Sequence, residues 1–246
     1  MDEYKDYTYK RFRKPRRFFL VVMLLLSVVA VVFSLNLIFG FISFGGGGGS
    51  RNTLELQGMT FYTLTSDEFT DKADAMEHAI NIRADGGAAF LRASGEAWQV
   101  IERVSNKEFE NSVAQVITPT SITLINQEHR ELVSNLASTF ITTLQELSDF
   151  YDRYSVNLVT QREISDKARI AYNNLIDLTA SFQEVMKIST NAAYEKIFVA
   201  LISQLLGLNV VWLEVNNQNF AHVLQNAMSW VAFAYVDLLN SVAQAA

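Results

Sequence analysis

The stretch DGGAAFLRASGEAWQV, residues 85–100, contains the paired glycines Gly86 and Gly87, a residue type that binds phosphate in the right setting. A phosphate-binding loop directs the free N–H groups of a helix N-terminus at the anion, which requires the order strand, glycines, helix. Here a segment of helical periodicity, residues 70–83, precedes the glycines, and strand-like residues follow them. We therefore predict that these glycines end a helix and turn the chain.

The residue types that carry most enzyme chemistry are scattered along the sequence. His78, His129 and His222 are isolated and lack the spacing of metal ligands. Carboxylate pairs such as Asp149 and Asp152 have the spacing of a solvated helix surface. The chain also contains no cysteine. We expect a protein that is not an enzyme and holds no metal or cofactor.

The N-terminal part of the chain has the pattern of a membrane anchor. Residues 1–17 carry seven basic and three acidic side chains, and residues 18–44 carry no charge. As a helix this apolar run would measure roughly 40 Å, enough to cross a hydrocarbon layer of about 30 Å. A cleaved signal peptide and a buried soluble helix are the alternatives, but both usually have shorter apolar runs.

Basic residues stay on the cytoplasmic side of a membrane. We therefore predict a cytoplasmic segment (1–17), a single transmembrane helix (18–44), a flexible glycine-rich linker (45–57) and an extracytoplasmic remainder. The only basic cluster adjoins the anchor, so we expect no nucleic-acid binding.

Residues 58–125 predict a small α+β unit with the order strand, helix, strand, strand, helix, strand. The predicted strands are residues 59–64, 88–92, 97–103 and 116–125, with Gly95 in the hairpin turn and Pro119 confining the last run to an edge or connection. The first helix, residues 70–83, would begin at Thr70 or Asp71. Its shared face would be Ala73, Met76, Ala79, Ile80 and Arg83. The second helix, residues 105–115, would begin at Ser105 with Glu108 as its capping-box partner.

Residues 126–246 predict a helical bundle. Apolar residues recur every three or four positions from Leu132 to Leu158 and again from Ile164 to Val185, with a turn expected near Thr160. Two further helices are expected over residues 192–208 and 217–243. The simplest arrangement is a four-helix bundle. A second membrane span over residues 197–213 is the alternative.

The α+β unit resembles the SPOR domains, which are the peptidoglycan-binding modules of bacterial division and sporulation proteins. The likeness is to versions from Gram-positive spore-forming lineages. It covers roughly a quarter of the chain and rests on the order of its elements and on these residues: Phe61, Tyr62, Phe69, residues 73–79, residues 86–90 and residues 98–100. Leu64, Ser66 and Gln99 stand where the family commonly has glutamine, glycine and arginine.

The resemblance implies binding of glycan strands by the exposed face of the sheet. Aromatic rings on a sheet can stack on the apolar face of a hexose. The candidate glycan-binding residues are therefore Tyr62, Phe90, Arg92 and Trp98, and the alternative for each is a place in the core. By strand alternation, Phe90 and Arg92 share one face of their strand.

The predicted fold class is a membrane-anchored α+β plus all-α protein: one transmembrane helix, a SPOR-like βαββαβ domain (58–125) and a helical bundle (126–246). Two functions follow. In the first, a cell-membrane protein binds peptidoglycan in division, sporulation or envelope organisation, while the bundle recruits a partner or self-associates. In the second, the chain is a membrane-anchored helical interaction or sensor protein whose SPOR-like unit is only structural.

Overall fold

The computed structural model describes residues 52–66, 68–124, 127–188 and 192–243, all within one compact unit, Gly49–Ala246. The predicted cytoplasmic segment (1–17) and transmembrane helix (18–44) lie outside the described residues. The predicted linker, residues 45–57, is too long at its C-terminal end, because Asn52–Leu56 forms the first strand, β1.

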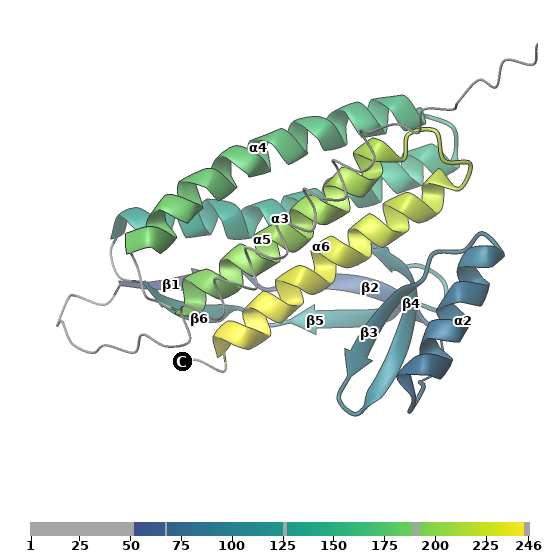
Figure 1. Cartoon of the computed structure of the whole chain (residues 1–246), viewed down its shortest axis with the longest axis horizontal. Helices are drawn as coiled ribbons and strands as arrows, with labels where there is room; N and C mark the ends of the chain where they lie inside the picture. The colour runs from purple at the N-terminus through teal and green to yellow at the C-terminus, as the bar shows by residue number, and fades with distance from the viewer. Residues whose placement is uncertain (1–51, 67, 125–126, 189–191, 244–246) are drawn as a thin grey trace, which may run out of the picture. The chain divides into compact units, whose positions relative to one another are not determined.

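A sheet region with one helix is followed by a run of helices (Figure 1). The strands are β1 (Asn52–Leu56), β2 (Met59–Thr65), β3 (Phe90–Ser94), β4 (Ala97–Ser105), β5 (Val113–Ile117) and β6 (Thr120–Leu124). The helices are α2 (Lys72–Ala84), α3 (Gln127–Ser155), α4 (Gln161–Ile188), α5 (Ala192–Leu213) and α6 (Phe220–Ala243). This order confirms mixed α+β content with the sheet region ahead of the helices.

The main sheet has the strand order β3-β4-β2-β5, and each neighbouring pair is antiparallel. Strands β2 and β3 are therefore parallel to each other, with β4 between them and α2 as the connection. This is a split βαβ unit. A separate two-stranded sheet pairs β1 with β6.

The two sheets are separated by a break at Gly58 and Pro119. A Cβ atom at Gly58 would lie 2.3 Å from the carbonyl oxygen of Ile117 and 2.8 Å from the nitrogen of Pro119, so only glycine fits there. Proline has no N–H to donate to a neighbouring strand. The chain therefore passes from one sheet to the other at this point. Pro119 lies in the connection between β5 and β6, so the single strand predicted over residues 116–125 is wrong and the run is divided between two strands.

Helix α2 begins and ends where its sequence predicts. The side chain of Asp71 accepts a hydrogen bond from the N–H of Ala73, which caps the N-terminus. At the C-terminus, the N–H of Gly87 donates to the carbonyl of Ile82 (2.7 Å) and that of Gly86 to the carbonyl of Arg83 (3.1 Å), with φ +85° at Gly86. This Schellman arrangement confirms that the paired glycines end a helix.

The shared face predicted for α2 is not the face that the helix buries. Ala79 is buried as expected, but its partner in the core is Ala75, while Met76 and Ile80 are 51% and 53% exposed. The small side chains of Ala75 and Ala79 let α2 lie close to Ala89 and Val100 of the sheet. Because α2 approaches the sheet closely through its two alanines, the larger side chains of Met76 and Ile80 lie on the solvent side of the helix.

The predicted second helix, residues 105–115, is wrong. Strand β4 continues to Ser105, whose hydroxyl accepts a hydrogen bond from the N–H of Lys107 (3.0 Å) in a turn, and β5 begins at Val113. Asn111 has φ 60°, which no helix interior allows. The hydroxyl of Ser105 also lies 3.1 Å from that of Ser148 in α3, so a helix from later in the chain packs here instead.

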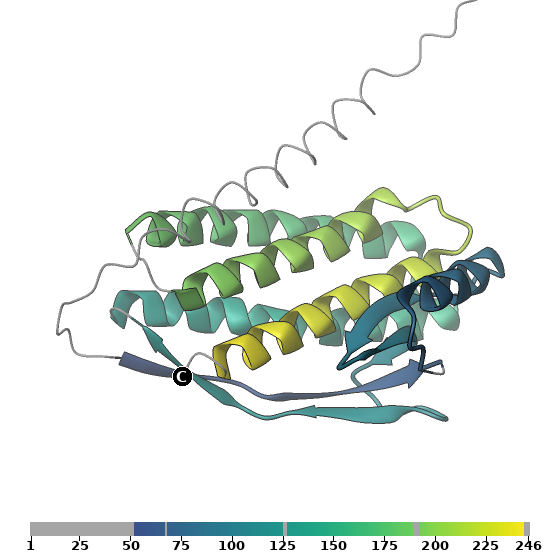
Figure 2. The ribbon, with the colours of Figure 1, turned by 60° about the horizontal axis from the view of Figure 1, so that its bottom comes forward.

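Helices α3 to α6 form a bundle along one side of the sheet (Figure 2). Helices α3 and α6 contact the strands, while α4 packs mainly on α5, and α5 on α6. The turn between α3 and α4 lies where it was predicted. Thr160 and Glu163 form a capping box at the start of α4.

The sheet and the bundle share one hydrophobic core. A register shift at the end of β2, opposite residues 101–103 of β4, turns both Ile101 and Val104 toward the bundle. Phe61 of β2 meets Phe233 of α6 edge to face, with ring centroids 5.5 Å apart. Helix α2 packs on the opposite face, in a smaller cluster of its own.

Candidate functional site

Strand β3 and helix α6 meet where the sequence predicted two glycan-binding residues, Phe90 and Arg92. The ring of Phe90 lies 5.4 Å from Trp230 in an edge-to-face arrangement and 5.7 Å from Phe233 in a stacked one. An aromatic ring with two aromatic neighbours has little face left for a sugar. Phe90 therefore packs in the interface between the sheet and the bundle.

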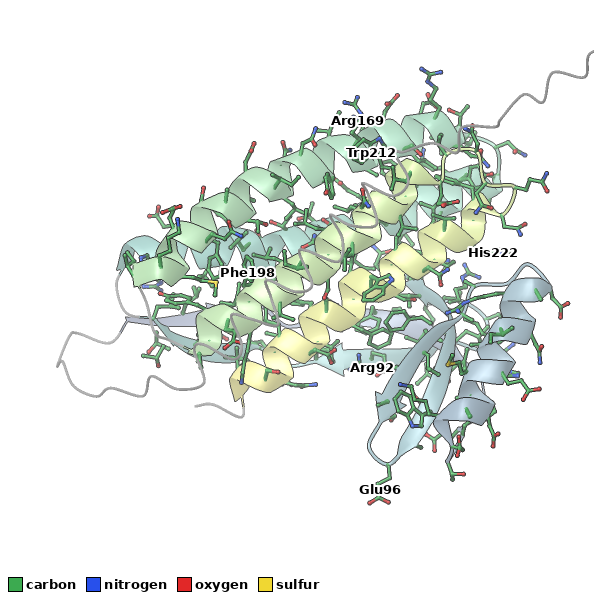
Figure 3. The ribbon with its side chains drawn as sticks, viewed as in Figure 1. Arg92, Glu96, Arg169, Phe198, Trp212 and His222 are labelled. Carbon is green, nitrogen blue, oxygen red and sulfur yellow. The ribbon has the colours of Figure 1, made fainter. Side chains whose placement is uncertain are left out.

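Arg92 also belongs to this interface (Figure 3). Its guanidinium donates to a carboxylate oxygen of Asp237 at 2.8 Å, and its central carbon lies 4.2 Å from the centroid of the Phe233 ring. The Arg92 side chain is 21% exposed and that of Asp237 is 64% exposed. Arg92 therefore links β3 to α6 at the edge of the core.

Trp98 lies on the other face of the sheet. Its cross-strand partner is Ala93, so it alternates with Phe90 and Arg92, and it packs half-buried against the α2 cluster. The ammonium of Lys72 lies 4.9 Å from the centroid of a Trp98 ring. The backbone N–H of Trp98 donates to the carbonyl of Phe69 at 2.7 Å, and the N–H of Phe69 donates to the carbonyl of Trp98 at 2.8 Å.

Tyr62 lies on the same side of the sheet as Trp98. In β2 it alternates with Phe61 and Thr63, which are buried toward the bundle, and is itself half-buried. The four candidate residues are thus divided between two faces: Phe90 and Arg92 toward α6, Tyr62 and Trp98 away from it. No single platform brings them together.

The partners of Phe90 and Arg92 were missed by the sequence analysis. Trp230, Phe233 and Asp237 lie three and four residues apart in α6 and share one face of that helix. The available signal was Asp237, the one carboxylate in a largely buried helix, because a charge beside a buried surface needs a partner.

Asp237 also lines a groove between α5 and α6 with a volume of about 340 Å³. Lys196, Ser203 and Ser241 contribute polar groups, and Val199, Ala200, Ala234 and Leu238 contribute apolar ones. The ammonium of Lys196 donates to the backbone carbonyl of Ser241 at 2.5 Å, which holds α5 to the end of α6. The groove thus combines an apolar floor with three charged side chains, Glu195, Lys196 and Asp237, of which Lys196 and Asp237 have the structural partners named above.

A second groove, of about 620 Å³, lies between α3 and α4. Phe150, Ile170 and Ala171 form its apolar part, and its rim carries charges of both signs. The guanidinium of Arg153 lies 3.7 Å from the carboxylate of Asp149 one turn earlier in α3. An exposed pair of this kind contributes little to stability and is no more than a solvated helix surface.

The three histidines lie in different surroundings. His129 hydrogen-bonds to the hydroxyl of Tyr194 at 2.8 Å in the bundle core, and the ring of His78 lies 5.2 Å from that of Phe69. Burial lowers the pKa of His222, which lies beside Gly86. Over the described ranges, no three or more histidines and carboxylates gather in a group able to hold a metal ion.

One helix in the part of the chain that the structure describes, α5, is long and apolar enough to cross a membrane, and half of its apolar stretch is buried in the bundle. The observed site is therefore a contact between the sheet and its own helical bundle, to which Phe90 and Arg92 belong. Tyr62 and Trp98 lie on the opposite face of the sheet. No protein-family model matches this chain, and neither a curated protein nor a solved structure matches it.

Proposed function

We propose that this chain is a membrane-tethered, extracytoplasmic protein-interaction module, in which the SPOR-like sheet is a structural platform for the helical bundle. The observation that carries the proposal is the burial of Phe90 and Arg92 against α6. The resemblance assigns glycan binding to the sheet face that no helix of the domain covers. In this chain the helical bundle covers that face of the sheet and shares one hydrophobic core with it.

The local energetics support a permanent contact. Phe233 is almost fully buried and touches Phe61, Phe90 and Arg92 together. Removing a buried phenylalanine side chain typically costs about 3–5 kcal/mol. A glycan strand would have to displace α6 and replace these contacts before it reached Phe90, so the sheet is better suited to carry the bundle than to bind sugar.

The membrane tether is supported by the sequence. Residues 18–44 are uncharged and long enough to span a bilayer, and the basic residues precede them. The sequence has a run of five glycines, Gly45 to Gly49, between this segment and the first strand, a composition typical of linkers. The bundle would then be presented close to the outer surface of the membrane.

Co-sedimentation with peptidoglycan sacculi tests the proposal. Residues 49–246 include the whole core of the described unit, so they can be purified without the apolar segment. We expect them to stay in the supernatant with intact sacculi and with sacculi stripped of stem peptides. Pelleting that falls with Trp98→Ala would overturn the proposal and place a glycan site on the α2 side of the sheet.

A second variant asks whether the bundle hides a working glycan site. Asp237→Ala removes the carboxylate partner of Arg92, and because the Asp237 side chain is 64% exposed the variant should fold. Asp177→Ala, an exposed carboxylate on α4, is the matched control. We expect neither variant to pellet. Pelleting of the Asp237 variant alone would mean that the sheet face binds glycan once Arg92 is released.

A further inference from the structure

Helix α5 has an outward face that lacks charge beyond the first turn of the helix, where Glu195 lies. Five apolar residues form this face, which we name the α5 stripe: Val199, Ile202, Leu206, Val210 and Leu213. Val199, Val210 and Leu213 are 45%, 39% and 57% exposed, and the other two are partly exposed. No charged residue occurs between Lys196 and Glu214. The outward face of a helix in a soluble bundle is normally polar, so this one has no partner among the residues that the structure describes.

The other sides of α5 are already occupied. Phe198 is buried, and the ring of Trp212 lies 5.6 Å from that of Tyr172 in α4 (both α5 residues are labelled in Figure 3). On the α6 side, a Cβ atom at Gly207 would lie 3.1 Å from the Cβ of Trp230. Trp230 is itself 39% exposed and borders the stripe near its centre.

The spacing of the stripe is self-complementary. Ile202 and Val210 lie four residues on either side of Leu206, and Val199 and Leu213 lie seven residues on either side. At 100° per residue, all five fall within a sector of about 80° and extend for roughly 21 Å. A two-fold axis through Leu206 would therefore place Val199 against Leu213 and Ile202 against Val210, as an isologous interface requires.

The charges at the two ends of the stripe fit the same antiparallel arrangement. Lys196 precedes Leu206 by ten residues, and Glu214, the first residue after α5, follows it by eight. The N–H of Glu214 still donates to the carbonyl of Val210, and 18 residues make five full turns, so both side chains project from the same side. A two-fold rotation brings Lys196 of one copy beside Glu214 of the other, and this contact forms twice. The ammonium of Lys196 donates to Ser241 and has further donors for a carboxylate.

We propose that two copies of this chain pair antiparallel through the α5 stripe. The pair buries five apolar side chains from each copy and forms two Lys196–Glu214 ion pairs across the axis. This inference names one partner for the interaction role proposed above and rests on that role for its purpose. Self-association and glycan binding are measured separately, so either can fail alone.

The oligomeric state of residues 49–246 and of the full chain in detergent tests the pairing. Light scattering and sedimentation should give a dimer for both. Leu206→Asp should weaken association by at least about tenfold, because it places a charge on the axis, where it meets its own copy. Ile80→Asp is the matched control, since Ile80 is 53% exposed on α2, and it should leave the dimer unchanged.

Cysteine cross-linking tests the antiparallel geometry, because the natural chain has no cysteine. Leu206→Cys should form a disulfide-linked dimer, and Ile80→Cys should not. Val199→Cys should cross-link when mixed with Leu213→Cys but neither should cross-link alone. Cross-linking of each variant with itself, and no cross-link between the two variants in the mixture, would mean a parallel pair and would overturn the proposal.

Charge exchange gives an independent check. Glu214→Lys should weaken the dimer, and the double variant with Lys196→Glu should restore it, because the pair of opposite charges returns with its order reversed. A monomer at every concentration would overturn the proposal. If that monomer binds lipid vesicles, the α5 stripe is a lipid-binding surface. If the full chain is monomeric and its α5 amides exchange hydrogen more slowly than those of residues 49–246, the α5 stripe binds residues 18–44 of its own chain.

Discussion

The hydroxyl of Tyr235 ties α6 to the sheet at the level of a single residue. Tyr235 is fully buried, its ring stacks on that of Phe140, and its hydroxyl donates to the backbone carbonyl of Gln57 at 2.7 Å. Gln57 lies between β1 and β2, next to the break at Gly58. Burial raises the pKa of Tyr235 to about 12, because a phenolate would lose its hydration there.

Tyr235→Phe should therefore change both the stability and its pH dependence. In the unfolded chain the hydroxyl ionises near its ordinary pKa of 10, and in the folded chain near 12. Its stabilising contribution is thus complete below pH 10 and is lost as the pH rises from 10 to about 12. At pH 7 the unfolding free energy of the variant should be about 1 kcal/mol below that of the parent, because the hydrogen bond is missing. This difference should shrink as the pH rises above 10.

Urea denaturation of residues 49–246 from pH 7 to 11.5 measures both effects. Tyr62→Phe is the matched control, because it removes the same atom from the half-buried face of β2 that lies away from α6. If the unfolding free energy of Tyr235→Phe falls with rising pH as steeply as that of the parent, a group other than Tyr235 controls the alkaline loss of stability.

The candidate site residues show what strand alternation can and cannot predict. Alternation correctly placed Phe90 and Arg92 on one face of β3, because it depends only on backbone geometry. It could not relate that face to the face of Trp98 on β4, since this depends on the register of the hairpin. It also could not show that α6, more than a hundred residues later, covers Phe90.

At the scale of elements, the start of α4 depends on Thr160 and Glu163. A carboxylate oxygen of Glu163 accepts hydrogen bonds from the N–H and the hydroxyl of Thr160, at 2.8 and 2.9 Å. These bonds lower the pKa of Glu163 below its ordinary value of 4.5, because they favour the charged form. The stabilisation is present above pH 4.5 and is lost as the pH falls through the lowered pKa.

Glu163→Ala should destabilise the chain at neutral pH, and the difference from the parent should shrink below pH 4.5. Thermal unfolding followed by circular dichroism from pH 3 to 7 measures this change. The control is Glu146→Ala, an exposed glutamate in the middle of α3. A difference that stays constant down to pH 3 would rule out the capping carboxylate as its source.

Local signals predicted the elements well where a few neighbouring residues decide the structure. Asp71 and Gly86 marked the ends of α2, and Gly95, with φ 62°, turned the hairpin as expected. The capping-box pattern at Ser105 was misleading, because the same serine can hold a turn. Which of the two forms there is decided by α3, whose Ser148 reaches Ser105 from far along the chain.

At the scale of the whole molecule, the sheet and the bundle should unfold together. Phe233 joins them through contacts with Phe61, Phe90 and Arg92, and their core is continuous. When two parts of a chain share one hydrophobic core, neither part can unfold without exposing the apolar side chains of the other, so they do not unfold independently. We expect one unfolding transition for residues 49–246, seen equally by helical circular dichroism and by tryptophan fluorescence.

Phe233→Ala tests this shared core. The variant should lose about 3–5 kcal/mol of unfolding free energy while keeping a single transition, because the cavity lies in the interface that both parts need. Ile176→Ala, a 42% exposed apolar residue on α4, should change stability by less than about 1 kcal/mol. Separate transitions for the helical signal and for the fluorescence of Trp98, read in a chain that carries Trp212→Phe and Trp230→Phe, would show that the sheet folds without the bundle. In that case its Phe90 face would be open to a ligand whenever α6 lifts, and the glycan-binding function would regain its physical basis.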